Sequence, residues 1–189
     1  MNNKEGLSKE DYQEHLKVEV ARAFAMQAHA GQQYGQYPYI YHLDQVAYHA
    51  KEFGETAVVI AYLHDILEDT DFIETSIQHH FGLEVLRCVQ LLTDPEGETR
   101  ISRKSALNNK LSQADESLNL ALIVKAADRV ANVRFCIKSK NFNMWKRYQL
   151  EYSAFRKAAY RPNLCERLWM ILDVLMEADA FVNFSDEIK

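Results

Sequence analysis

The chain has 189 residues, of which 48% are hydrophobic and 26% charged, a globular composition with enough length for one well-buried domain. It contains no apolar run long enough to span a bilayer, and the N-terminal stretch MNNKEGLSKEDYQEHLK lacks the apolar segment of a secretory signal. Three scattered cysteines, Cys88, Cys136 and Cys165, argue against a disulfide framework or a zinc knuckle and indicate core thiols. We therefore expect a cytoplasmic protein that does not engage membranes.

The net charge of −5 is distributed unevenly along the chain. Residues 100–150 carry eleven Lys and Arg against three Asp and Glu, a local excess of +8, so the remainder carries −13. Such an excess favours an anionic ligand near this segment, and it fits a solvated basic face equally well. Nucleic acid is disfavoured as a partner, because the whole protein is acidic and lacks the interleaved aromatic and basic residues of a single-strand binder.

Helical periodicity of apolar residues runs along the chain, whereas alternating β-branched runs are almost absent. It predicts about nine helices, at residues 15–30, 45–54, 56–70, 71–82, 83–94, 99–114, 117–139, 143–160 and 163–182. Gly54 and Gly82 are expected to end two of these helices, and Thr56 is expected to cap the third. No repeat or linker interrupts the pattern, so we expect a single all-α domain over residues 1–189.

The stretch LHDILEDTD places an unusual acidic cluster on an otherwise apolar helix. His64 and Glu68 form one i,i+4 pair, and Asp65 and Asp69 form another on the adjoining flank. Like charges at this spacing destabilise a helix, and a divalent cation would compensate them. A second histidine four residues after His64 is absent, so the HExxH pattern of a zincin is not supported. The alternative is a solvated acidic face.

Two further residues are candidate metal ligands. His42 follows Pro38 at a predicted junction between loop and helix, and Asp128 lies within the most apolar helix of the chain. A buried carboxylate needs a partner, which for Asp128 alone could be Lys125 or Arg129. Two imidazoles and two carboxylates, taken together, form a mixed nitrogen and oxygen set that suits Mn²⁺, Fe²⁺ or Zn²⁺ better than Ca²⁺.

The order His42, His64–Asp65, Asp128 resembles the H…HD…D pattern of the HD-domain phosphohydrolases. The longer stretches PYIYH, LHDILEDTD, HFGLEVLRCVQLLTD and KAADRVANVR resemble more closely the hydrolase domain of the RelA/SpoT family. Among its members they are most similar to the small stand-alone alarmone hydrolases, which include the metazoan SpoT homologs. The resemblance covers about residues 18–152.

This resemblance implies an all-α HD-domain helical bundle with one Mn²⁺, held by the two histidines and two aspartates named above. It implies removal of the 3′-pyrophosphate from the stringent-response alarmones (p)ppGpp, which returns GDP or GTP. Glu68 and Asp69 match the acidic pair that handles water and protons in this family. Six further positions match residues that the family uses near the substrate: Arg100, Arg103, Lys104, Asn132, Arg134 and Tyr152.

The loop Gly31–Ile40, GQQYGQYPYI, departs from the family pattern because it contains no Lys or Arg. Tyr34 or Tyr37 could stack on a purine in place of the missing cation. The base specificity is therefore open, as are the physiological metal and the oligomeric state. The alternatives are an HD phosphohydrolase acting on another phosphorylated nucleotide, such as ppApp or the 2′-phosphate of NADPH, and a non-catalytic alarmone-binding module. The intact acidic pair argues against the last of these.

Overall fold

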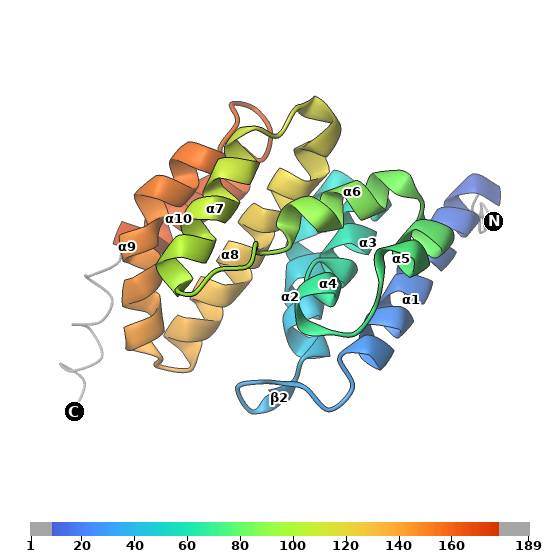
Figure 1. Cartoon of the computed structure of the whole chain (residues 1–189), viewed down its shortest axis with the longest axis horizontal. Coiled ribbons are helices and arrows are strands. Elements are labelled where there is room, and N and C mark those ends of the chain that lie inside the picture. Colours follow the sequence, from blue (N-terminus) through green and yellow to red (C-terminus); the bar gives the residue numbers. More distant parts are fainter. Residues whose placement is uncertain (1–8, 178–189) are drawn as a thin grey trace, which may run out of the picture.

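The computed structural model describes residues 9–177 and is almost entirely helical (Figure 1). Its α-helices are α1 (Lys9–Ala28), α2 (Ile40–Ala50), α3 (Glu55–Leu63), α4 (Ile66–Asp69), α5 (Glu74–Phe81), α6 (Leu83–Leu92), α7 (Arg100–Ser112), α8 (Asn119–Lys138), α9 (Phe142–Ala159) and α10 (Glu166–Glu177). Two short 3₁₀ helices lie at Lys51–Phe53 and Glu116–Leu118, and β1 (Gln33–Tyr34) pairs antiparallel with β2 (Tyr37–Pro38). The predicted all-α class is confirmed.

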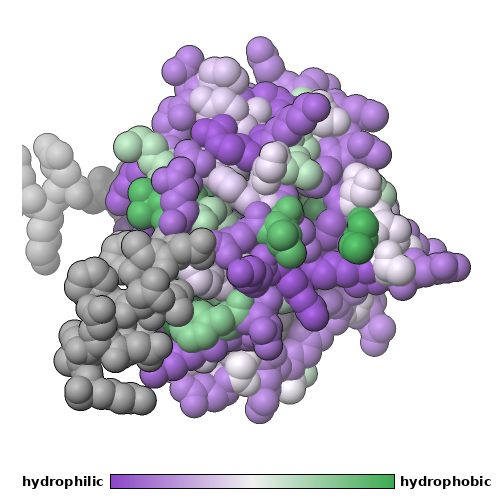
Figure 2. Space-filling view, turned by 90° about the vertical axis from the view of Figure 1, so that its left-hand side faces the viewer, coloured by the Kyte–Doolittle hydropathy of each residue, from purple (hydrophilic) through white to green (hydrophobic). Residues whose placement is uncertain are grey.

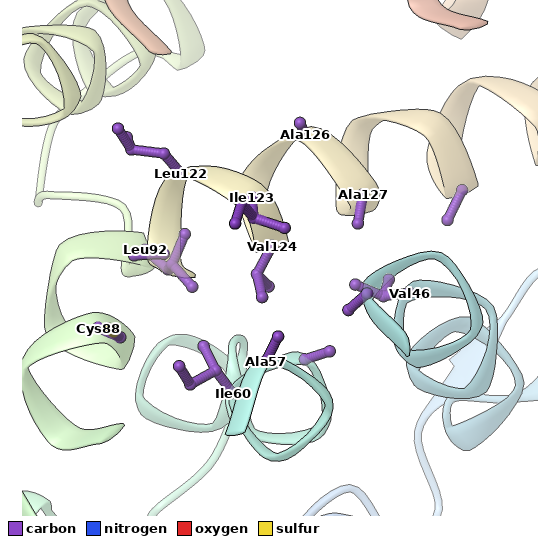
Figure 3. Close-up of a cluster of buried hydrophobic side chains, with 14 of the residues drawn as sticks. Val46, Ala57, Ile60, Cys88, Leu92, Leu122, Ile123, Val124, Ala126 and Ala127 are labelled. Atoms are coloured by element: carbon purple, nitrogen blue, oxygen red, sulfur yellow. The ribbon is translucent and has the colours of Figure 1, made fainter. Parts of the chain in front are cut away.

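Helix α8 is the centre of the fold. It contacts α2, α3 and α6 on one side and α9 and α10 on the other (Figure 1). Residues 121–131 are all buried, which explains why the first half of this helix is apolar on every side. Figure 3 shows Val124 directed toward Ala57 and Ile60 of α3, with Val46 of α2 beside them. This packing holds the side chains of α8 rigidly against α2 and α3.

The predicted helix 56–70 is broken between Leu63 and Ile66. Helix α3 ends at Leu63 and α4 begins at Ile66, because Asp65 leaves the helical path with φ −102° and ψ 0°. The predicted cap Thr56 is wrong. The helix begins one residue earlier, and Gly54 (φ +95°) precedes it in a conformation that only glycine adopts easily. Gly82 (φ +90°) ends α5, as predicted.

The three cysteines are buried and unpaired, which confirms their prediction as core thiols. The face over α9 and α10 is mainly hydrophilic, with hydrophobic residues in small separate groups (Figure 2), and scattered exposure of this kind is ordinary for a folded surface. Within residues 9–177, no helix has the length and apolar character to cross a membrane. Residues 178–182 of the last predicted helix, and the first eight residues of the N-terminal stretch, lie outside the described part.

Candidate active site

The four predicted metal ligands converge from three parts of the fold. His42 comes from α2, His64 and Asp65 from the break between α3 and α4, and Asp128 from α8. His42 Nε2 lies 3.3 Å from Asp128 Oδ1, and His64 Nε2 lies 3.0 Å from Asp65 Oδ2. Both imidazoles are almost completely buried, at 2% and 1% exposure. Four ligand atoms are thus gathered around one point beneath the surface.

The helix break sets the direction of the His64 ring. His64 Nδ1 lies 2.7 Å from the carbonyl oxygen of Ala61, which can only accept, so Nδ1 carries the proton. Nε2 is therefore the ring nitrogen that faces Asp65 and Asp128. A histidine that donates to a backbone carbonyl through one nitrogen and offers the other is the usual arrangement of a metal ligand.

The carboxylates of Asp65 and Asp128, the two predicted acidic ligands, are held by neighbouring side chains. The hydroxyl of Tyr39 donates to Asp65 Oδ2 over 2.5 Å. Asn132 Nδ2 donates to Asp128 Oδ1 over 2.5 Å, and the hydroxyl of Tyr34 donates to Asn132 Oδ1 over 2.6 Å. Tyr34 and Asn132, which were expected to lie near the nucleotide, therefore also orient the Asp128 carboxylate. Such outer contacts fix the geometry of metal sites.

The charges in the cluster fit a cation. Burial lowers the pKa of His64, but the carboxylates of Asp65 and Asp128 outweigh it and raise that pKa to about 10. Lys125 Nζ lies 3.6 Å from Asp128 Oδ2, so the expected alternative partner of Asp128 is present as well. The two carboxylates thus attract positive charge, from Lys125 and from the His64 ring. His42, His64 and Asp65 offer ligand atoms within 4.8 Å of one another, and Asp128 Oδ1 lies 3.3 Å and 3.7 Å from the two imidazoles, so the four groups can hold a divalent metal ion.

A cavity of about 250 Å³ opens beside this cluster. Its walls combine acidic, basic and aromatic side chains: Tyr34, Tyr39, His42, Asp65, Glu68, Asp69, Arg100, Lys104, Lys125, Asp128, Arg129, Asn132 and Tyr148. The acidic members come mainly from the break and α4, and the basic members come from α7 and α8. We call this space the metal cavity.

Glu68 and Asp69 line the metal cavity from the single turn of α4. Glu68 Oε2 accepts a hydrogen bond of 3.1 Å from the backbone N–H of Asp94. Both side chains keep contact with solvent, but partial burial in the cavity raises the pKa of each carboxyl, and the charge of Asp65 adds to this. A carboxyl with a raised pKa takes up a proton more readily, which suits a group that accepts and returns protons.

The basic wall is built from ion pairs. Arg100 binds Glu151 through two hydrogen bonds of 2.8 and 3.1 Å, and Arg129 approaches the same carboxylate at 3.4 Å. The Arg129 guanidinium also lies 4.6 Å from the ring centre of Tyr148. These pairs hold the cations at the cavity wall in fixed directions.

Lys104 completes this wall, with its Nζ 2.5 Å from Asp94 Oδ2. Four cavity residues were not predicted as site residues: Tyr39, Lys125, Arg129 and Tyr148. Lys125 and Arg129 lie three residues before and one after Asp128, so helical spacing from that ligand was the available signal.

Three residues predicted to contact substrate do not line the metal cavity. Arg103 donates to the carbonyl oxygen of Gly97 over 3.1 Å. The hydroxyl of Tyr152 donates to Asp173 Oδ1 over 2.5 Å, which ties α9 to α10. Arg134 lies elsewhere along α8, beside a second cavity. Neighbouring elements engage Arg103 and Tyr152 away from the metal cluster, and the three assignments to substrate stay predictions.

The hairpin turn at Gly35 supports Tyr34. Gly35 has φ +61°, and a Cβ at this position would lie 2.6 Å from the ring of Phe135, on which Tyr34 also packs. We expect Gly35→Ala to displace Tyr34, to weaken metal binding and to lower the melting temperature. Gly31→Ala is the matched control, because Gly31 also has positive φ (+83°) but open space around its Cβ. Gly31→Ala should lower the free energy of unfolding only by the cost of a left-handed backbone at alanine, roughly 1–2 kcal/mol. Equal metal affinity in the two variants would contradict this role of the hairpin.

The fold and this cluster define a metal-binding HD-domain protein. A family model described as an HD domain matches residues 21–154, well over half of the chain, and the chain belongs to that family. The matched residues include the four predicted metal ligands as well as Glu68 and Asp69.

Individual relatives are similar over shorter spans. Guanosine-3′,5′-bis(diphosphate) 3′-pyrophosphohydrolase MESH1 of Mus musculus is 38% identical over 101 residues, which are 51% of this chain and 55% of that protein. A guanosine-3′,5′-bis(diphosphate) 3′-pyrophosphohydrolase of Aquifex aeolicus is 34% identical over 129 residues, 65% of this chain and 18% of that protein. The chain thus spans about half the length of the MESH1 relatives it matches.

A solved structure shares the fold. It is described as a metazoan ortholog of SpoT that hydrolyzes ppGpp and plays a role in starvation responses. It superposes with a TM-score of 0.74 at 20% sequence identity and covers 86% of this chain and 94% of its own. At this identity the superposition establishes the HD-domain architecture.

Proposed function

We propose that this protein is a metal-dependent phosphohydrolase that removes the 3′-pyrophosphate from the guanosine alarmones (p)ppGpp, releasing GDP or GTP and pyrophosphate, with Mn²⁺ as its ion. One observation carries the proposal: a single cavity joins a cluster of metal ligands, two further carboxyls and four cations. The similarity to proteins named as 3′-pyrophosphohydrolases supports the choice of substrate. All helices from α1 to α10 pack on one connected core, which supports a single hydrolase domain.

His42, His64, Asp65 and Asp128 would hold the ion. When bound, a divalent ion supplies Lewis-acid activation of water and compensates the charge of the phosphates. Tyr39 and Asn132 keep the two aspartates in place through their hydrogen bonds, so the ligand set is formed before substrate arrives. Both imidazoles are almost completely buried, which fixes their positions beside the two aspartates.

Glu68 and Asp69 would act as the general base and general acid of the reaction. A carboxylate oxygen of this pair orients the attacking water and accepts its proton as the oxygen attacks the phosphorus. The bond between that phosphorus and the ribose 3′-oxygen breaks, and one carboxyl returns a proton to the leaving oxygen. Pyrophosphate and the 5′-phosphorylated nucleoside are then the two products.

The basic wall would neutralise the departing group. Arg100, Lys104, Lys125 and Arg129 face the cavity from α7 and α8 and offer N–H donors to phosphate oxygens. Their carboxylate partners Glu151 and Asp94 hold them in position before substrate binds. This arrangement supports the interpretation of the basic middle segment as an anion site rather than a solvated face.

The substrate is tested by a panel of phosphorylated nucleotides. Initial rates of phosphate and pyrophosphate release are measured for ppGpp, pppGpp, ppApp, NADPH and cyclic nucleotides with Mn²⁺ present. We expect the highest kcat/KM for ppGpp or pppGpp. A preference for ppApp or NADPH would retain the hydrolase and change its substrate, and binding without turnover of any nucleotide would favour an alarmone-binding module.

A further inference from the structure

Helix α4, which carries Glu68 and Asp69, is a single turn that depends on other elements for its direction. It spans Ile66–Asp69, which is only four residues. A helix this short is unstable in water by itself, because few hydrogen bonds offset the cost of ordering its backbone. The chain becomes extended at Thr70, so the last carbonyl groups of α4 have no partner further along the helix. The directions of Glu68 and Asp69 are therefore set by contacts from outside α4.

Gln32, in the segment between α1 and α2, makes one such contact. Its Nε2 donates to the carbonyl oxygen of Asp69 over 2.6 Å, although the two residues lie 37 positions apart in the sequence. The hydroxyl of Tyr39 also lies 3.3 Å from Asp69 Oδ2, but it has a single proton and donates it to Asp65 at 2.5 Å. Gln32 therefore makes the shorter of the two contacts that join Asp69 to this segment.

His29 holds the Gln32 amide in one orientation. Because the carbonyl of Asp69 can only accept, the amide must present its NH₂ group to α4 and its oxygen to the other side. That oxygen, Oε1, lies 2.8 Å from His29 Nδ1, so Nδ1 is the donor and carries the proton. His29 is only 3% exposed, and its ring stacks on that of Tyr39 with 4.6 Å between ring centres. The hydrogen bonds from His29 to Gln32 to Asp69 thus run in a single direction.

The backbone also fixes Gln32 in place. Its N–H donates to the carbonyl oxygen of His29 over 3.0 Å, and its own carbonyl oxygen accepts from the N–H of Tyr39 over 3.1 Å. A side chain whose backbone and tip are both held loses little conformational freedom when it binds another element. His29, Gln32 and Tyr39 therefore form a preorganised support for the end of α4, of the kind that a precise catalytic geometry requires.

We propose that Gln32 is a positioning residue for the acid–base pair on α4, and that His29 sets the direction of its amide. Neither side chain lines the metal cavity, so both act through the backbone of α4. The inference rests on the proposed function, in which Glu68 and Asp69 transfer protons. It predicts a loss of turnover with substrate binding retained, because the cations of the basic wall lie on α7 and α8.

The kinetic test removes the donor of this contact. Gln32→Ala deletes the amide, and Gln32→Glu keeps the length of the side chain but offers no N–H to the Asp69 carbonyl. With Mn²⁺ and ppGpp, both variants should lower kcat by roughly 10–100-fold, because a misplacement of about 1 Å can cost this much, while KM and bound Mn²⁺ change by less than about twofold. Gln33→Ala is the matched control and should keep kcat, because Gln33 is the adjacent, exposed glutamine outside the metal cavity.

A change at His29 tests the second half of the proposal. His29→Phe keeps a flat ring against Tyr39 but cannot donate to the Gln32 amide, which is then free to rotate. Its kcat should fall by about threefold to tenfold, the worth of one net hydrogen bond, with KM retained. A kcat equal to that of the wild type would show that His29 does not set the direction of the amide.

Hydrogen exchange tests the same contact without turnover. Exchange of the backbone amides in residues 64–73 is followed by mass spectrometry on the full chain without substrate, and residues 121–131 of α8 serve as the internal reference. Gln32→Ala should speed exchange in residues 64–73 by about threefold to tenfold and leave the reference unchanged. Gln33→Ala should match the wild type in both segments.

Three results would overturn the assignment of Gln32. They are an unchanged kcat in Gln32→Ala and Gln32→Glu, a raised KM with kcat retained, and equal exchange of residues 64–73 in the wild type and Gln32→Ala. A different result would contradict the proposed function alone. Faster exchange in Gln32→Ala, in a protein whose wild type hydrolyses no alarmone, would leave the support of α4 standing and remove the reaction assigned to it.

Discussion

Alanine at His64 or Asp128 is expected to remove both the bound metal and all measurable hydrolysis. Each side chain directs one predicted ligand atom into the cluster, where His64 Nε2 lies 3.7 Å from Asp128 Oδ1, and both residues are buried. Metal content is measured by elemental analysis on purified protein, and hydrolysis is measured by release of pyrophosphate. Asp128→Ala also leaves the buried Lys125 without its ion pair, so its melting temperature should fall.

The control for this prediction is His49→Ala. His49 is also a buried histidine near α8, but it contacts Arg134 rather than the ligand cluster. This variant should keep its metal, which separates the loss of a ligand from the general loss of a buried imidazole. Full metal occupancy in His64→Ala or Asp128→Ala would show that the cluster is not the metal site.

Glu68→Gln and Asp69→Asn are expected to lower kcat by roughly 10²–10⁴ while metal and substrate binding persist. An amide keeps the size of the carboxyl and can still orient water, but it cannot accept a proton. Near-wild-type turnover in both variants would show that Glu68 and Asp69 take no part in proton transfer and form only a solvated helix face. Asp71→Asn, an exposed acidic residue just after α4 and outside the metal cavity, is the matched control and should leave kcat unchanged.

The same two variants should keep or slightly raise the free energy of unfolding. The folded protein raises the pKa of both carboxyls, so ionisation is harder in the folded state than in the unfolded state. Such a group stabilises the fold at pH below its unfolded pKa and loses that contribution as pH rises through the folded value. At neutral pH the charged form therefore costs stability, which a neutral amide does not. Melting temperatures near pH 7 measure this difference.

The sequence was sufficient to single out four side chains that the structure brings together, but not the local backbone that presents them. His42, His64, Asp65 and Asp128 could be predicted because an imidazole or carboxylate within an apolar helix stands out against its neighbours. The break at Asp65 could not, because helical periodicity continues through it. The hydrogen bond between the His64 ring and the Ala61 carbonyl, which accompanies the break, carries no sequence signal.

Substrate contacts were harder to predict than metal ligands, because the tertiary structure determines which group a long side chain contacts. Tyr148 and Tyr152 lie one turn apart on α9, yet Tyr148 faces the metal cavity and Tyr152 binds Asp173 of α10. Arg134 and Arg100 were both predicted to contact substrate, but the packing of α2 against α8 places Arg134 in a different cavity from Arg100.

The central claim is that the metal cavity cleaves the 3′-pyrophosphate of a guanosine alarmone. The most direct measurement incubates the manganese-loaded protein with ppGpp and quantifies every product, with Asp128→Ala as the inactive reference. Our account predicts GDP and pyrophosphate in equal amounts and neither product from the variant. Intact ppGpp after prolonged incubation with the metal-loaded wild type, or orthophosphate in place of pyrophosphate, would contradict it.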